Sequence, residues 1–155
     1  MSDPRLAIRD ATRDDLDFLN GCAAAMALET EHKQLDPMRL ARGVETLLRE
    51  PSRGFYLIAE QAGTRVGTLM VTYEWSDWRG GDFWWIQSVY VVPSARRRGV
   101  YRALHDATRR RAHAAGAVGL RLYVEQDNAR AQATYATLGM HQSTYALFED
   151  DFTAG

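Results

Sequence analysis

The sequence contains little cysteine and little proline. Cys22 is the single cysteine among 155 residues, so an intramolecular disulfide is excluded, and a small buried side chain is the simplest interpretation of this residue. Four prolines and twelve glycines are too few for a disordered or fibrous chain and are typical of a folded protein. The four histidines show no ligand spacing with one another or with Cys22, and no metal is expected.

Long hydrophobic runs and a strong excess of one charge are also absent. No segment approaches the about 18 apolar residues of a membrane helix, and the start of the chain has no signal-peptide hydrophobic region. A cytoplasmic location with no membrane partner is therefore expected. The formal net charge of −1 argues against general attraction to nucleic acid.

The order of the hydrophobic patterns predicts one α+β domain over residues 1–155 with a mixed sheet. Period-2 or continuously apolar segments indicate strands, which are predicted at residues 6–9, 55–59, 66–73, 83–92, 119–124 and 143–148. Helical spacing predicts helices that begin at Thr12, Asp36, Val100 and Asn128 and end near His32, Pro51, Gly116 and Gly139. Residues 83–92 are too apolar for an edge strand and should be central.

The loop after this central strand carries the main functional signal. Pro93 stops the strand, Arg96–Tyr101 leads into a helix, and the first N–H groups of that helix lie at the positive end of its dipole. Gly99 permits a tight turn, and the arginines add charge for phosphate oxygens. The loop alone fits an anion site and a solvated basic stretch equally well.

The spacing of this loop resembles motif A of the GNAT superfamily of N-acetyltransferases. That motif has Gln or Arg, two residues, Gly, one residue, and Gly or Ala, and here Arg96, Gly99 and Tyr101 stand at the three defined positions. Tyr101 departs from the pattern. A second part of the family pattern is similar to Asn128 and Tyr135, and the resemblance is closest over residues 83–140.

The resemblance implies a fold, a cosubstrate and an assembly. The fold is a mixed, mostly antiparallel sheet of six to seven strands flanked by about four helices, with strands 4 and 5 parallel and splayed. The cosubstrate is acetyl-CoA, and a homodimer is common in the family. Acetyl-CoA binding is assigned by the resemblance to Val89, Tyr90, Val91, Arg96, Arg97, Arg98, Gly99, Val100, Tyr101, Asn128, Ala131 and Tyr135.

Asn128, Ala131 and Tyr135 are spaced three and four residues apart, which places them on one face of a helix. Asn128 is also readable as a simple N-cap, and Tyr135 as a core aromatic residue. The resemblance makes Tyr135 the candidate general acid. A phenol of pKa about 10 is a weak proton donor to a thiolate of pKa about 8.5, so its role is expected to be mainly hydrogen-bond donation.

The general base is less defined, because Trp85 stands where the histone acetyltransferase branch has a Glu. Catalytic candidates are Glu29 and Glu31, and the alternatives are His32, Glu74, Glu125 or a water chain. In the superfamily the acceptor groove is walled by the first two helices and by the connection between strands 3 and 4. The predicted substrate-binding residues are Glu29, Glu31, His32, Glu74 and Trp75. Carboxylates beside aromatic rings suit a small cationic primary amine.

Two other functions are open. Seven arginines between residues 96 and 111 are typical of a nucleic-acid-binding helix, although they fall on different helical faces and no helix-turn-helix or zinc spacing is present. A GNAT fold that binds acyl-CoA without catalysis is the second alternative. The prediction is an N-acetyltransferase with a small-molecule amine substrate and no nucleic-acid partner.

Overall fold

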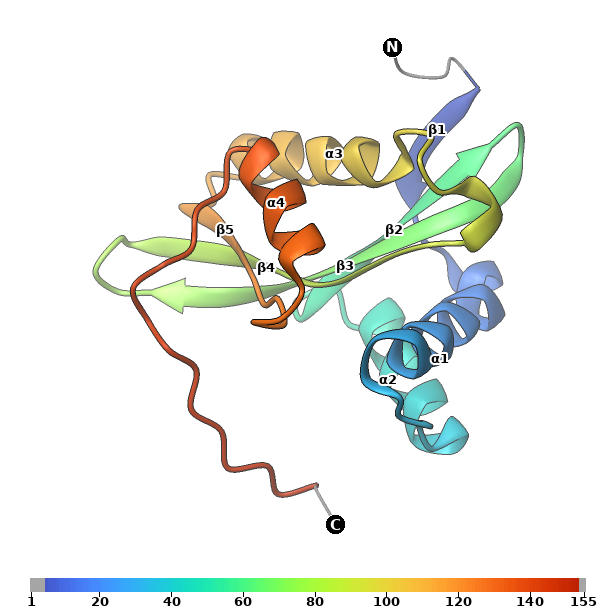
Figure 1. The fold of residues 1–155 in the computed structure, drawn as a ribbon, viewed down its shortest axis with the longest axis horizontal. Coiled ribbons are helices and arrows are strands. Elements are labelled where there is room, and N and C mark those ends of the chain that lie inside the picture. The colour runs from blue at the N-terminus through green and yellow to red at the C-terminus, as the bar shows by residue number, and fades with distance from the viewer. Residues whose placement is uncertain (1–4, 154–155) are drawn as a thin grey trace. The chain divides into compact units, whose positions relative to one another are not determined.

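The computed structural model describes residues 5–153 and divides the chain into two units, Met1–Tyr123 and Val124–Gly155 (Figure 1). The strands of the first unit are β1 (Leu6–Asp10), β2 (Gly54–Gln61), β3 (Thr64–Ser76), β4 (Gly81–Val91) and β5 (Gly119–Leu122). Its helices are η1 (Arg13–Asp15), α1 (Leu16–Glu31), α2 (Pro37–Arg49), η2 (Pro93–Ala95) and α3 (Val100–Ala114). The second unit contains α4 (Ala129–Thr137).

The sheet has the order β1-β2-β3-β4-β5. The first four strands pair antiparallel, and β5 pairs parallel to β4. The α+β class, the mixed sheet, the parallel fourth and fifth strands and the four α-helices therefore agree with the sequence-based expectation.

The predicted count of six to seven strands is wrong, because the described part of the chain forms five. The missing strand is the one expected at residues 143–148, which adopts no regular secondary structure. Tyr145, Leu147 and Phe148 are 77%, 61% and 94% exposed. Alternating apolar residues favour a strand, but a strand also needs a neighbouring backbone, and no described strand pairs with this segment.

Local signals fix where α1 and α2 begin and end. Thr12 and Asp15 form the predicted capping box ahead of α1, and Asp36 accepts hydrogen bonds from the N–H groups of Met38 and Arg39 at the start of α2. His32 adopts a left-handed conformation with φ of 54° and ends α1.

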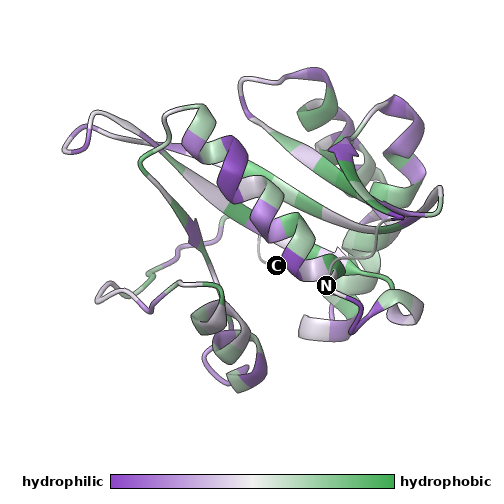
Figure 2. Ribbon diagram, turned by 90° about the horizontal axis from the view of Figure 1, so that it is seen from above, coloured by the Kyte–Doolittle hydropathy of each residue, from purple (hydrophilic) through white to green (hydrophobic). Residues whose placement is uncertain are grey.

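Helices cover both faces of the sheet in the first unit (Figure 1). The larger core lies between the sheet and α3, and Leu57, Leu69 and Leu104 are completely buried there. The second core joins Leu19 of α1 and Val44 of α2 to the opposite face of β2. Figure 2 shows the hydrophobic strands beneath α3, whose ribbon alternates between hydrophilic and hydrophobic residues. No helix among residues 5–153 has the length and apolar character needed to span a membrane.

Gly67 allows α3 to approach the sheet closely. A Cβ atom at this position would lie 3.0 Å from the Tyr90 carbonyl oxygen and 3.2 Å from a methyl group of Val100. Val100 is the first residue of α3 and is 2% exposed. The start of α3 is therefore held against the end of β4.

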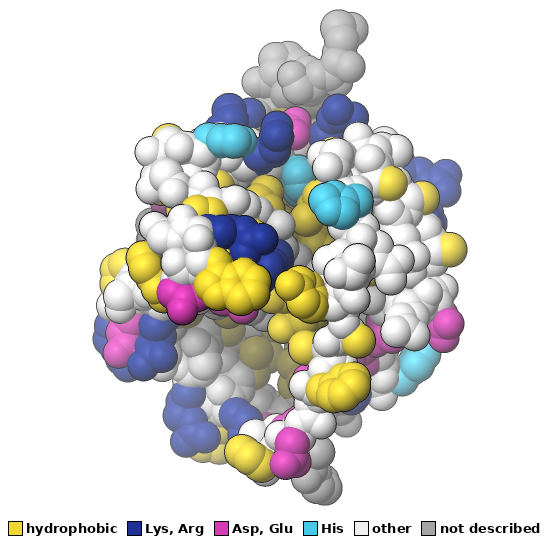
Figure 3. Space-filling model, turned by 90° about the vertical axis from the view of Figure 1, so that its left-hand side faces the viewer, with side chains coloured by type: hydrophobic (Ala, Val, Ile, Leu, Met, Phe, Trp, Pro, Cys, Tyr) yellow, Lys and Arg dark blue, Asp and Glu magenta, His cyan; other side chains and the backbone are white. Residues whose placement is uncertain are grey.

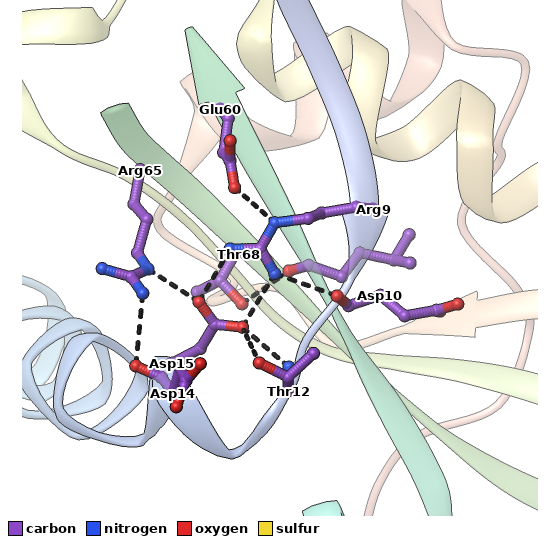
Figure 4. Close-up of polar contacts among 9 residues, drawn as sticks. Arg9, Asp10, Thr12, Asp14, Asp15, Glu60, Arg65 and Thr68 are labelled. Atoms are coloured by element: carbon purple, nitrogen blue, oxygen red, sulfur yellow. Dashed lines mark hydrogen bonds and ion pairs between the residues drawn. The ribbon is translucent and has the colours of Figure 1, made fainter. Parts of the chain in front are cut away.

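A buried carboxylate ties β1, η1 and β3 together (Figure 4). The Asp15 side chain is fully buried and accepts two hydrogen bonds of 2.8 Å from the Arg9 guanidinium and one of 2.6 Å from Arg65 Nε. The Thr12 N–H donates a further bond of 2.7 Å. These donors, Arg9 first, hold the pKa of Asp15 well below its usual range although burial opposes this.

Replacing Asp15 with Asn is expected to lower the free energy of unfolding by about 3 kcal/mol, because Arg65 then loses its charged partner and Arg9 keeps only Glu60. Urea denaturation at pH 7 measures the change. Asp14→Asn, an exposed neighbour, is the matched control and should change stability by less than about 0.5 kcal/mol. The wild-type chain should lose the Asp15 contribution as the pH falls below about 4, where the unfolded state binds the proton. Equal stability of the two variants would contradict a stabilising role for Asp15.

His105 is a buried histidine in α3. It is 2% exposed, and neither ring nitrogen has a hydrogen-bond partner among the described residues. Burial lowers its pKa, Arg109 and Arg102 lower it further, and Asp106 opposes them. Burial in the folded protein therefore favours the neutral form of this imidazole.

Stability is expected to fall with pH below about 6.5, by up to about 1.4 kcal/mol per pH unit, because the unfolded state protonates His105 and the folded state resists it. Urea denaturation at pH 7.5 and 5.5 measures this slope. A His105→Leu variant should show a smaller slope, whereas the exposed His113→Gln control should keep the wild-type slope. The same slope in His105→Leu and the wild type would show that another group titrates.

Candidate functional site

The loop between β4 and α3 has the backbone of an anion site. Arg97 and Gly99 have positive φ values of 64° and 81°, and α3 starts at Val100. Ala103 N–H donates a helical bond of 3.0 Å to the Gly99 carbonyl, so the first turn of α3 begins at this glycine and presents the N-terminal end of the helix dipole. A left-handed non-glycine residue such as Arg97 is strained and is often found at functional loops.

The ends of this loop are fixed and its centre is open. Ala95 and Val100 are 3% and 2% exposed and pack in the larger core. Arg97, Arg98 and Gly99 between them are exposed. Two guanidinium groups and the start of α3 therefore face solvent on a rigidly held turn, which suits an oligophosphate.

The second element of the site is the separation of β4 from β5. Parallel pairing covers only four residues and ends where Ile86 faces Leu122. β4 continues to Val91, and in the described part of the chain residues 88–91 pair with β3 alone. Val89, Tyr90 and Val91, expected at the cosubstrate site, therefore lie beyond the end of the β4–β5 pairing.

A β-bulge accompanies the splay. Met70 faces Ser88 and Val71 faces Ile86, which leaves Gln87 as the extra residue of β4. Gln87 Nε2 donates a hydrogen bond of 2.7 Å to Thr72 Oγ1. A bulge re-aims backbone groups, and it coincides here with the end of the β4–β5 pairing.

Glu29 was predicted to act on the acceptor amine and Arg96 to bind acetyl-CoA, and the structure brings the two side chains into contact. Arg96 Nη2 donates to Glu29 Oε2 at 2.9 Å, and the Tyr90 hydroxyl donates to Glu29 Oε1 at 3.0 Å. The Arg96 bond and then the Tyr90 bond lower the pKa of Glu29. A lowered pKa makes this carboxylate a weaker base, so its contacts favour a structural role.

Glu31 and His32 lie at the exposed end of α1. Glu31 is 3.8 Å from Lys33 Nζ, and its side chain is 46% exposed. His32 forms the left-handed end of the helix. The backbone geometry at the end of the helix accounts for His32. The Glu31 carboxylate is accessible to solvent.

Glu74 and Trp75 lie near the end of the β3–β4 hairpin, and strand alternation directs them to opposite faces of the sheet. Glu74 accepts a hydrogen bond of 2.6 Å from Arg121 of β5. Trp75 is 66% exposed. Figure 3, which views this end of the molecule, shows hydrophobic side chains beside basic and acidic ones.

Two residues near Glu74 were not expected from the sequence. Arg121 pairs with Glu74 and lies 3.6 Å from the centroid of the Phe83 ring, and Tyr123 lies 4.4 Å from the Trp85 ring, centroid to centroid. Both contacts follow from the parallel register of β4 and β5, in which Arg121 is the partner of Trp85. A single strand pattern does not reveal register, so these contacts needed the tertiary structure.

The second unit holds the other part of the family pattern. Asn128 caps α4, and its side-chain oxygen accepts a hydrogen bond of 3.0 Å from the Ala131 N–H. Tyr135 lies on the same helix, and its side chain and that of Ala131 are half-buried. The capping interpretation of Asn128 is thus confirmed, while its role toward acetyl-CoA and that of Tyr135 stay predictions.

Several arginines of the basic segment 96–111 have acidic partners. Arg96 pairs with Glu29, Arg111 with Asp10, and Arg102 lies 3.9 Å from Asp106. These pairs reduce the positive potential that a nucleic-acid interface would use. Among residues 5–153 no three His, Cys, Asp or Glu side chains are grouped to hold a metal ion.

Comparison with known proteins identifies the family. The model of the acetyltransferase (GNAT) family matches residues 18–140. The crystal structure of a possible acetyltransferase from Clostridium difficile 630 is 40% identical, with a TM-score of 0.90 over 96% of this chain and 99% of that chain. A search of curated proteins finds no match.

Two more distant structures share the fold. Aminoglycoside N-acetyltransferase AAC(6′)-Iy in complex with CoA is 18% identical, with a TM-score of 0.78 over 97% of this chain and 99% of that chain. Ribosomal-protein-alanine N-acetyltransferase from Brucella melitensis biovar Abortus 2308 is 17% identical, with a TM-score of 0.75 over 95% and 99%. On the family match and the 40% identical structure, this chain belongs to the acetyltransferase (GNAT) family.

Proposed function

We propose that this acetyltransferase moves an acetyl group from acetyl-CoA directly to an amine bound at the same time. The observation that carries the proposal is the joint presence of an exposed turn, Arg97–Gly99, at the start of α3 and a β4 strand that extends beyond its pairing with β5. The first suits phosphates and the second offers unpaired strand backbone. The CoA complex of a structure with the same fold supports the choice of cosubstrate.

The residues of the first unit fit acetyl-CoA in two ways. The N–H groups at the start of α3, with Arg97 and Arg98, would hold the pyrophosphate by charge-assisted hydrogen bonds. The free edge of β4 at residues 87–91 would bind the amide groups of the pantetheine arm as a neighbouring strand would. Tyr101 contributes only its backbone to the phosphate turn, because its side chain packs against the larger core.

Acetyl transfer requires three contributions from the protein. Acetyl-CoA supplies an acetyl thioester. The backbone N–H groups of the bulged part of β4 would polarise the acetyl oxygen, which is the largest electrostatic contribution in acyl transfer. The family resemblance, and not the placement of the second unit, assigns Tyr135 as hydrogen-bond donor to the departing sulfur. Glu31 or a water chain would accept the proton of the amine.

The proposed acceptor is a small cationic primary amine. Glu31 has an exposed carboxylate at the end of α1, and Trp75 presents an exposed ring near the hairpin end. Glu29 and Glu74 are paired with arginines at 2.9 Å and 2.6 Å, whereas Glu31 has a longer contact of 3.8 Å with Lys33, so most of the attraction for a second positive charge falls on Glu31. Recognition by few charges predicts moderate selectivity among amines.

Purified protein is expected to release free CoA from acetyl-CoA when an amine is present, measured by thiol titration over a panel of alkyl diamines, alkyl monoamines and amino acids. The kcat/KM should be roughly tenfold higher for diamines than for amino acids, because a second cation is attracted and a carboxylate is repelled. Glu31→Gln should reduce this preference without changing the KM for acetyl-CoA.

Replacing Arg97 and Arg98 together with Gln is the complementary variant, and it should raise the KM for acetyl-CoA at least about tenfold. Binding of acetyl-CoA without thiol release for any amine would replace the proposed function with that of a non-catalytic acyl-CoA sensor. Equal rates for diamines and amino acids would remove the cationic acceptor.

Tyr135→Phe is expected to lower kcat about 10- to 100-fold while the Kd for acetyl-CoA stays within about twofold, because only a donor to the departing sulfur is lost. Steady-state kinetics and equilibrium binding give the two numbers. Tyr145→Phe is the matched control, since this tyrosine is 77% exposed and lies in the same unit. An unchanged kcat in Tyr135→Phe would remove Tyr135 from the mechanism.

A further inference from the structure

A closed network joins the end of α1 to the start of the phosphate turn. The Arg96 guanidinium donates through Nε to the Val91 carbonyl at 2.9 Å and through Nη2 to Glu29 at 2.9 Å. Its Cζ lies 5.4 Å from the centroid of the Tyr90 ring, and the Tyr90 hydroxyl donates to the other oxygen of Glu29. Each of the three side chains thus contacts the other two.

The network closes the turn between β4 and α3. The bond from Arg96 to Val91 spans η2, and a second bond, from the Ala95 N–H to the Val92 carbonyl, lies inside it. Glu29 stands on α1, 67 residues away from Arg96 in sequence, so a distant helix holds the first residue of the turn. Figure 1 shows α1 beneath the end of β4 where this turn begins.

The geometry separates Arg96 from Arg97 and Arg98. The Arg96 guanidinium is shared among a carbonyl, a carboxylate and an aromatic face. It therefore has a defined place and a neutralising partner. Arg97 and Arg98 are exposed and carry the positive charge that faces an anion.

We propose that Glu29 is a positioning residue for acetyl-CoA: its carboxylate holds Arg96 and Tyr90 so that the turn before α3 has the shape that binds the pyrophosphate. This inference rests on the proposed function. It gives Glu29 a role other than the general base that the sequence suggested. It also makes the end of α1 move together with the phosphate turn, so acetyl-CoA and a ligand at the end of α1 should affect each other's binding equally.

Electrostatics and positioning predict opposite changes in the Kd of acetyl-CoA for the substitution Glu29→Gln. Glu29→Gln removes a negative charge near an anion site, and simple electrostatics then predicts tighter binding of acetyl-CoA. Loss of positioning predicts weaker binding, because Arg96 and the turn gain freedom. The sign of the change in Kd therefore separates the two effects.

The test measures the Kd of acetyl-CoA by isothermal titration calorimetry for the wild type, Glu29→Gln, Arg96→Gln and the double variant. Glu29→Gln should raise the Kd about fivefold to tenfold, comparable to the loss of one charge-assisted hydrogen bond. Arg96→Gln should raise it at least as much. The double variant should bind no more weakly than Arg96→Gln alone, because both substitutions break the same link.

Controls and kinetics exclude the alternatives. Glu31→Gln removes the same charge two residues further along the chain and should not weaken acetyl-CoA binding. Tyr90→Phe, which removes a single hydroxyl, should raise the Kd by a smaller factor and gives the result if Glu29→Gln does not fold. In steady-state assays Glu29→Gln should raise the KM for acetyl-CoA and keep both kcat and its pH profile.

Wild-type protein that does not bind acetyl-CoA would overturn the proposed function itself. Wild-type binding with equal or tighter binding by Glu29→Gln would overturn only the positioning role. Additive effects in the double variant, or a fall in kcat with an altered pH profile at unchanged KM, would also overturn it, and the latter would return Glu29 to the role of general base.

Discussion

The site depends on the short parallel pairing between β4 and β5. A central strand normally pairs along both edges, and among the described strands of the first unit β4 pairs only with β3 beyond Ile86. The bulge at Gln87 falls at the same point, so the strand both loses a partner and changes the direction of its backbone groups. Backbone without a partner next to a rigid sheet is suited to a ligand that can act as a strand, which the amides of pantetheine can do.

Rigid structure supports the end of β4 and the turn that follows it. Gly67 lets Val100 sit against the end of β4, and the buried Asp15 ties β1, η1 and β3 into one unit. The turn between β4 and α3 is therefore strained locally, at Arg97, while its ends are held in the core. A ligand at this turn loses little free energy to ordering of the protein.

The electrostatic character of this molecule depends more on which charged side chains pair with one another than on how many charged residues there are. Arg96, Arg102 and Arg111 lie beside acidic side chains, and the carboxylates of Glu29 and Glu74 lie beside arginines. Considered alone, the arginines of residues 96–111 suggest a nucleic-acid site, and the carboxylates suggest a cation site. The structure leaves Arg97 and Arg98 as exposed positive groups on the turn and Glu31 as an accessible acidic group at the end of α1.

The hydrophobic periodicity and the turn residues of the sequence were sufficient for β1 to β5, for the four α-helices of the described chain and for the position of the turn before α3, because these follow from interactions within a few residues. Residues 143–148 have the pattern of a strand and yet form none, since a strand depends on a neighbour that its own sequence does not specify. The link between Glu29 and Arg96 and the pair of Glu74 with Arg121 were equally hidden. These contacts join residues far apart in the chain, and only the register of the sheet and the placement of α1 bring them within hydrogen-bond distance. The sequence by itself thus determined the five strands, the four α-helices and the family that the chain resembles, while the tertiary structure decided that residues 143–148 form no strand, which charged side chains neutralise one another and which remain exposed.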